Sequence, residues 1–281
     1  MKLEIPNYET KKELLDFLVT HKETLIAQKK SILKEADGIG SYYKQEQELK
    51  SVNKSQEGSD MSVNEIKVRA IINTTNYLDS HKDVHIKGIW QKSLKENKRI
   101  MHIQEHMSSS FDKIIASGDD LKAFTKTMTW KELGYDADGN TQALVFDSVV
   151  KESRNPYMFN QYKQGFVENH SVGMRYVKIE LAINDKDYPT EKAFYDKYIT
   201  EIINRKEAED SQYFWVVTEA KIIEGSAVPF GSNPITPTTR MKSEPSMIDL
   251  IKGIGTQKKA ADSTFNIISE IQKYNFNLNK V

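Results

Sequence analysis

The stretch Ile66-Lys67-Val68-Arg69-Ala70-Ile71-Ile72 marks the beginning of a folded domain. Apolar side chains at positions 66, 68, 70 and 72 alternate with charged ones at 67 and 69, which is the period-two pattern of a half-buried β-strand. The preceding residues, 45–62, are almost wholly polar and predict a linker. The β-rich part of the chain is therefore expected to begin near residue 63.

Further strand-like and helix-like stretches follow this first strand. The sequence Asp-Ala-Asp-Gly-Asn at 136–140 predicts a turn between two of the strands. We expect an α+β fold with an antiparallel, barrel-like β core and peripheral helices. The strands are predicted at 99–107, 122–130, 141–150, 171–183 and 213–228, and the helices at 88–97, 157–169 and 190–209.

The region before the linker has a helical pattern. Thr10 and Glu13 have capping-box spacing, and leucine and isoleucine side chains then recur at helical intervals. Lys22 and Lys29 interrupt this apolar seam, so a surface helix or partner-binding arm is favoured over a coiled coil. We expect three parts: an N-terminal helical arm with its linker at 1–62, the main domain at 63–240, and a C-terminal helical tail at 241–281.

The composition limits the chemistry. The 281 residues include 40 basic and 40 acidic ones, so the chain has no global charge to attract nucleic acid. No apolar run approaches the roughly 18 residues of a membrane span, and the first residues lack the apolar core of a signal peptide. We therefore expect neither nucleic acid nor membrane as a partner. The absence of cysteine excludes disulfides, thiolate nucleophiles and cysteine-ligated metals.

Ser171 is a candidate nucleophile. It lies in His170-Ser171-Val172-Gly173-Met174, at the junction of an expected helix and a long strand. Gly173 leaves the backbone approachable, so the hydroxyl can attack a substrate carbonyl once a base removes its proton. A capping or edge hydroxyl is the alternative for a serine at the start of a strand.

His106 is the candidate base. Strand alternation over 99–107 places Met101 and Ile103 on one face and His102, Gln104 and His106 on the other. If the first face is core, His106 faces a cleft or solvent, and an ordinary histidine pKa suits proton transfer near neutral pH. A solvated surface histidine is the alternative. The two histidines would lie roughly 13 Å apart on such a strand, too far to share one metal ion.

The last predicted strand offers two carboxylates. Strict alternation places Glu224 on the apolar face with Ala220 and Ile222, whereas Glu219 lies on the face of Lys221. A carboxylate on an apolar face requires a partner because burying an unpaired charge is costly. A histidine would serve as that partner. The alternative is that the carboxylate of Glu224 reaches solvent at the end of the strand.

Taken in order, these segments resemble the prohead protease family of tailed phages, whose members are similar in fold to the herpesvirus capsid-maturation protease. The resemblance covers about residues 66–238. Its motifs are Asp-x-x-x-Asp-Val-x-x-x-Gly from Asp79, the histidine of Gln104-Glu105-His106, Ser-Val-Gly from Ser171, and Glu-x-Ser-x-Val-x-Phe-x-x-Asn-Pro from Glu224.

The resemblance implies a serine endopeptidase with Ser171 as nucleophile, His106 as base and Glu224, or alternatively Glu219, as the third member. It implies no metal and no cofactor. The implied substrates are the major capsid protein and a scaffold protein, inside the assembling prohead in the host cytoplasm. Self-cleavage and self-association are further expectations. The alternatives are a catalytically silent head-assembly or scaffold protein with this fold, and an unrelated β-barrel binding module with Ser171 and His106 far apart.

Overall fold

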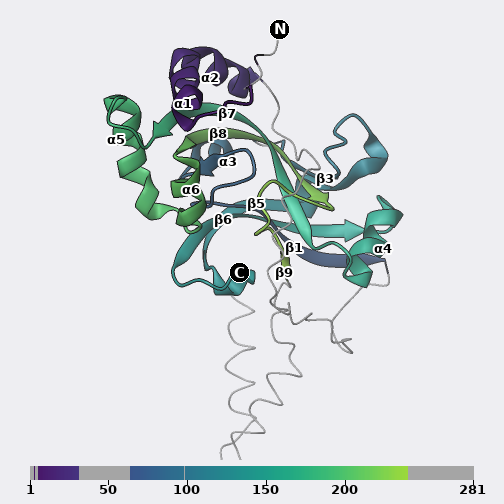
Figure 1. The fold of residues 1–281 in the computed structure, drawn as a ribbon. Helices are drawn as coiled ribbons and strands as arrows, with labels where there is room; N and C mark the ends of the chain where they lie inside the picture. The colour runs from purple at the N-terminus through teal and green to yellow at the C-terminus, as the bar shows by residue number, and fades with distance from the viewer. Residues whose placement is uncertain (1–2, 4–5, 32–63, 98, 240–281) are drawn as a thin grey trace, which may run out of the picture. The chain divides into compact units, whose positions relative to one another are not determined.

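A computed structural model describes residue 3 and residues 6–31, 64–97 and 99–239. These residues form a mixed α+β fold with two sheets and several helices (Figure 1). The linker expected at 45–62 and the tail expected at 241–281 lie outside the described residues. In the part that the structure describes, no helix is long and apolar enough to cross a membrane.

The first sheet is antiparallel, with strand order β5-β6-β1-β9. The predicted alternation is confirmed at the start of β1, where Ile66 and Val68 are buried and Lys67 is exposed. Beyond Ala70 the strand is buried on both faces, because Ile71 packs into a second apolar cluster on the far side of the sheet. The strands are β1 (Glu65–Thr74), β5 (Leu121–Thr129), β6 (Asn140–Lys151) and β9 (Thr238–Thr239).

The second sheet is built around β8 (Tyr213–Val228), which pairs with three other strands. It is antiparallel to β7 (Asn169–Ile183) and parallel to both β2 (Asp83–His85) and β3 (Met101–Gln104). Strand β4 (Ile114–Ser117) joins β3 in antiparallel fashion. The expected wholly antiparallel core is therefore wrong for this sheet. More than a hundred residues separate β3 from β8, which is ample chain for the crossover that parallel strands require.

Apolar side chains of the two sheets form one main core. Ile72 and Phe146 from the first sheet lie in the same cluster as Val172 and Ile222 from the second. Strands β7 and β8 bury long apolar runs there, as expected for a sheet covered on both faces. Across the described residues the two sheets remain separate and do not close into a barrel.

The N-terminal segment forms two helices, α1 (Lys11–Thr20) and α2 (Lys22–Ser31), where one was expected. The predicted capping box at Thr10 is confirmed. Leu18 and Leu25 enter the main core, and both helices belong to the same compact unit as the strands. Lys22 and Lys29, which interrupt the apolar seam, make ion pairs with the β-rich part of the chain, to Glu191 at 2.8 Å and Asp83 at 2.5 Å.

The remaining helices are shorter than predicted. Helix α3 spans Gln91–Glu96, and α4 (Pro156–Gln164) ends early because Gly165 adopts a left-handed conformation. The helix expected at 190–209 is divided by a 3₁₀ turn into α5 (Pro189–Tyr198) and α6 (Arg205–Ser211). Both pack on the opposite face of β8 from the main core, against Phe214 and Val216. Figure 1 shows α5 and α6 together at one side of β8.

Candidate active site

His106 and Glu224 form a close, largely buried pair. Nδ1 of the imidazole lies 2.6 Å from Oε1 of the carboxylate, and their side chains retain 7% and 4% exposure. An ionised carboxylate only accepts hydrogen bonds, so the neutral imidazole must carry its proton on Nδ1. Its Nε2 atom is then the unprotonated nitrogen, the one that can accept a proton.

The backbone before His106 brings the ring to this position. Strand β3 ends at Gln104, and both Glu105 (φ 51°) and His106 (φ 57°) adopt left-handed conformations. The expectation that strand alternation sets the direction of His106 is therefore wrong. The assumed faces are also wrong: His102 and Gln104 are buried and Met101 is exposed, because the face of His102 packs against Phe146 and Tyr162.

Glu224 reaches the imidazole from the face of β8 that lies opposite the main core. Ala220 and Ile222 point into the core, and so does position 225, where an added Cβ would meet Phe146 and Ile72. A register shift between β7 and β8 at residues 222–224 reverses the alternation. The predicted burial of Glu224 is confirmed, but its predicted face is wrong because of this irregularity.

Ser171 lies on the same face as Glu224, one strand away. In the antiparallel pair, Ser171 is opposite Ser226 and Gly173 is opposite Glu224. Facing residues in such a ladder have Cα atoms about 4.5–5.5 Å apart, with their side chains on one face. Ser171 is 6% exposed, and its hydroxyl has no hydrogen-bond partner among the described residues. The structure therefore joins His106 to Glu224 directly and places Ser171 beside them, without a hydrogen bond.

Gly173 provides the space for the carboxylate. A Cβ atom built at this position would overlap Oε1, the oxygen of Glu224 that binds His106. The glycine of the Ser-Val-Gly segment is thus needed for the side chain opposite it. The carboxylate leans across toward β7, which carries Ser171.

Ser226 is a member of the site that alternation did not identify. Its hydroxyl donates to Oε2 of Glu224 at 2.7 Å and accepts from the backbone N–H of His106 at 3.0 Å. The signal was present in the sequence, because two residues at Glu-x-Ser spacing share one face of a strand.

Glu219, the alternative third member, lies outside this cluster. Its carboxylate binds Lys178 at 2.9 Å and Lys92 at 3.3 Å. The hydrogen bond from Lys178 lowers the pKa of Glu219 below its ordinary value. The structure therefore brings His106 together with Glu224 and not with Glu219.

A buried polar chain lies on the other side of Ser171, toward the core. Tyr162 bridges two imidazoles, with its hydroxyl 3.1 Å from Nε2 of His102 and 3.0 Å from Nε2 of His170. Burial lowers the pKa of His102 well below its ordinary value and lowers that of His170 to about 4. Both imidazoles are therefore neutral near pH 7 and serve here as hydrogen-bonded core residues.

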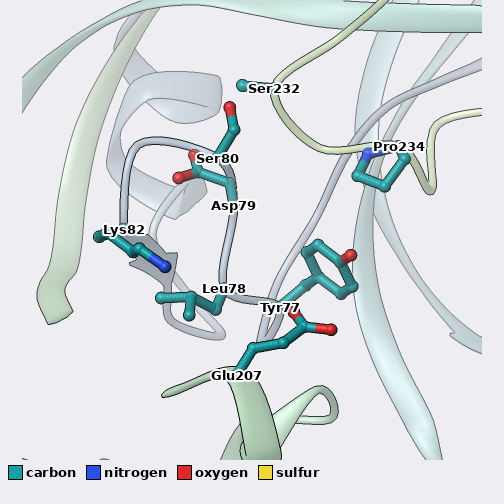
Figure 2. Close-up of a pocket in the computed structure, with 8 residues that line it drawn as sticks. All are labelled: Tyr77, Leu78, Asp79, Ser80, Lys82, Glu207, Ser232 and Pro234. Atoms are coloured by element: carbon teal, nitrogen blue, oxygen red, sulfur yellow. The ribbon is translucent and has the colours of Figure 1, made fainter. Parts of the chain in front are cut away.

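A pocket of about 200 Å³ lies between other elements and contains none of the expected site residues. Figure 2 shows Asp79 and Ser80 on one loop, with Ser232 near Ser80 and with Tyr77 beside Glu207. Burial, together with the neighbouring Asp83, raises the pKa of Asp79 to about 8. One oxygen of this carboxyl group accepts the backbone N–H groups of residues 81 and 83, so Asp79 closes a tight turn.

Among the described residues, no three histidine, aspartate or glutamate side chains lie close enough together to hold a metal ion. Comparison of the chain with protein-family models, with curated proteins and with solved structures finds no match.

Proposed function

We propose that this chain is a serine endopeptidase in which Ser171 is the nucleophile, His106 the base and Glu224 the residue that orients the imidazole. The observation that carries the proposal is the 2.6 Å contact between His106 and Glu224 on the face of the sheet that also presents Ser171. A base oriented by a carboxylate beside a serine is the arrangement that activates a hydroxyl for acyl transfer.

In the proposed reaction, Oγ of Ser171 bonds to the peptide carbonyl carbon while its proton passes to Nε2 of His106. The C–N bond then breaks, and the same proton goes to the leaving amine. Water next attacks the acyl-enzyme, again with His106 as base, and releases the new carboxyl terminus and the free serine. Glu224 stabilises the imidazolium in both steps through the Nδ1–H bond.

The proposed substrates are the major capsid protein and a scaffold protein of a tailed phage, with the chain itself as a further substrate. This part of the proposal rests on the ordered motifs that resemble prohead proteases. The same resemblance supports three further proposals: action inside the prohead, a barrel-like core and self-association. The proposed chemistry uses no metal and no cofactor.

Co-expression with the proposed capsid and scaffold substrates, followed by intact mass analysis, tests the proposal. The wild-type chain should shorten one or both partners at defined bonds, and the Ser171→Ala chain should leave them intact. Ser171 is a small side chain at the beginning of β7, so its truncation should preserve the fold, as circular dichroism would verify. Uncut partners with the wild-type chain would instead favour a silent assembly protein.

A further inference from the structure

We infer that Ser226 is the positioning residue of the site: its hydroxyl holds the carboxylate and the histidine in the geometry that proton transfer requires. The inference rests on the proposed function, since it assigns a role within that site. Ser226 is fully buried. It therefore acts through its neighbours and not on a substrate.

The single proton of the Ser226 hydroxyl determines which hydrogen bond this group donates and which it accepts. A serine hydroxyl has a single proton, and here Ser226 directs that proton to Oε2 of Glu224. Its lone pairs are then left to accept the N–H of His106. Both oxygens of Glu224 are fixed as a result, Oε2 by Ser226 and Oε1 by the imidazole.

The same hydroxyl supports an unfavourable backbone. Left-handed conformations are unfavourable for residues other than glycine, and the chain adopts two in succession at Glu105 and His106. The N–H of Glu105 binds the carbonyl of Ala227 at 2.9 Å, and the N–H of His106 binds Ser226. These two bonds attach the turn to the end of β8. Without the hydroxyl of Ser226, the turn can relax and carry the imidazole away from Ser171.

The test measures the reactivity of Ser171 without requiring a known substrate. Diisopropyl fluorophosphate forms an O–P bond to an activated serine, fluoride leaves, and the hydroxyl proton passes to the base. Mass spectrometry of the full chain gives the rate of labelling, and peptide mapping locates the label. We expect Ser226→Ala to slow labelling of Ser171 about 100-fold, the typical effect of a small misplacement of a reacting group.

Two further variants separate positioning from simple destabilisation. Ser226→Cys keeps a similar volume but has a weak donor and acceptor, so it should fold and label slowly even if the alanine variant unfolds. Ser148→Ala is the matched control, because Ser148 is equally buried and binds Nδ1 of His102 at 2.9 Å outside the site. This control should label at the wild-type rate when each variant is assayed at a temperature where it is fully folded.

A second readout is independent of activity. The Nδ1–H proton of His106, bound to Glu224, should give a downfield proton resonance that is present in the wild type and Ser148→Ala and lost in Ser226→Ala. Folded Ser226 variants that label at the wild-type rate and keep this resonance would overturn the inference. An unlabelled wild-type chain would instead count against the proposed function, so the two failures are distinguishable.

Discussion

The carboxylate of Glu224 occupies the space that a side chain at position 173 would fill. Gly173 lies directly opposite Glu224 in the β7–β8 pair, and the carboxylate leans over it toward His106. The absence of a Cβ atom on one strand therefore determines where the charge on the next strand is placed. This relationship can be tested by adding one methyl group.

Gly173→Ala should reduce the labelling rate of Ser171 by about 100-fold, because the new methyl group displaces Oε1 of Glu224 from the imidazole. Gly225→Ala is the matched control on β8. Its added methyl group meets Phe146 and Ile72 in the core, so it should cost about 1–3 kcal/mol of stability with little change in labelling rate at a temperature where it is folded. Equal labelling by Gly173→Ala and the wild type would contradict the prediction.

Glu224→Gln should reduce the rate by up to about 10⁴-fold with little loss of stability. The amide can donate to Nδ1 of His106, which favours the wrong imidazole tautomer and removes the base from Nε2. Glu219→Gln should be nearly silent, since Glu219 binds Lys178 and Lys92 away from the imidazole. Turnover of one capsid-derived peptide by both variants checks the pair. An active Glu224→Gln beside an inactive Glu219→Gln would show that the assignment is reversed.

The stability of the fold should depend on pH through His170. Burial lowers its pKa from 6.5 to about 4, so between these values the unfolded chain binds a proton more readily than the folded one. The contribution is fully present above pH 6.5 and is lost as the pH falls toward 4, by about 3 kcal/mol in total. Urea unfolding at pH 7 and pH 4.5 measures this loss.

The comparison requires a variant because His102 acts in the same direction as His170, and Asp79 acts in the opposite direction. Its raised pKa means that the folded chain holds the proton more tightly, so acidification through the same range favours folding. We expect His170→Asn to lose less stability than the wild type between pH 7 and pH 4.5. An equal loss in both chains would rule out His170 as the source.

Lys29→Met should destabilise the protein by about 3 kcal/mol, because Asp83 is fully buried and loses the cation that binds it at 2.5 Å. Lys12→Met is the control on the neighbouring helix, where the lysine and its partner Asp187 are both exposed. It should change the unfolding midpoint little. A small effect at both positions would show that the buried pair is not what fixes α2 to the sheet.

Much of the secondary structure could be predicted from the sequence. The alternation of Ile66 and Val68 identified β1, and the long apolar runs identified β7 and β8. Short strands escaped prediction: β2, β4 and β9 have two to four residues each, too few for a period to be recognised. The parallel pairing of β3 with β8 depends on contacts between distant segments and leaves no local pattern.

Two of the proposed site residues, His106 and Glu224, lie in contact, but the geometry that joins them could not be predicted from the sequence. Glu224 was expected to need a cationic partner because strict alternation buried it, yet the register shift at 222–224 places it on the other face. His106 was assigned a direction from strand periodicity that the chain abandons at Glu105. Ser226 was noted only as part of the motif that begins at Glu224, and its importance comes from two hydrogen bonds across the fold.

The central place of β8 bears on when the proposed site can form as the protein is made. Within the described chain, β8 alone pairs with both β3 and β7, and it supplies Glu224 and Ser226. His106 and Glu224 are 118 residues apart, so their contact requires closure of a long loop and no local folding step produces it. A growing chain on the ribosome thus already carries the serine and the histidine but lacks the strand that aligns them. The His106–Glu224 contact forms once β8 has been synthesised and docked, so it is a product of late folding.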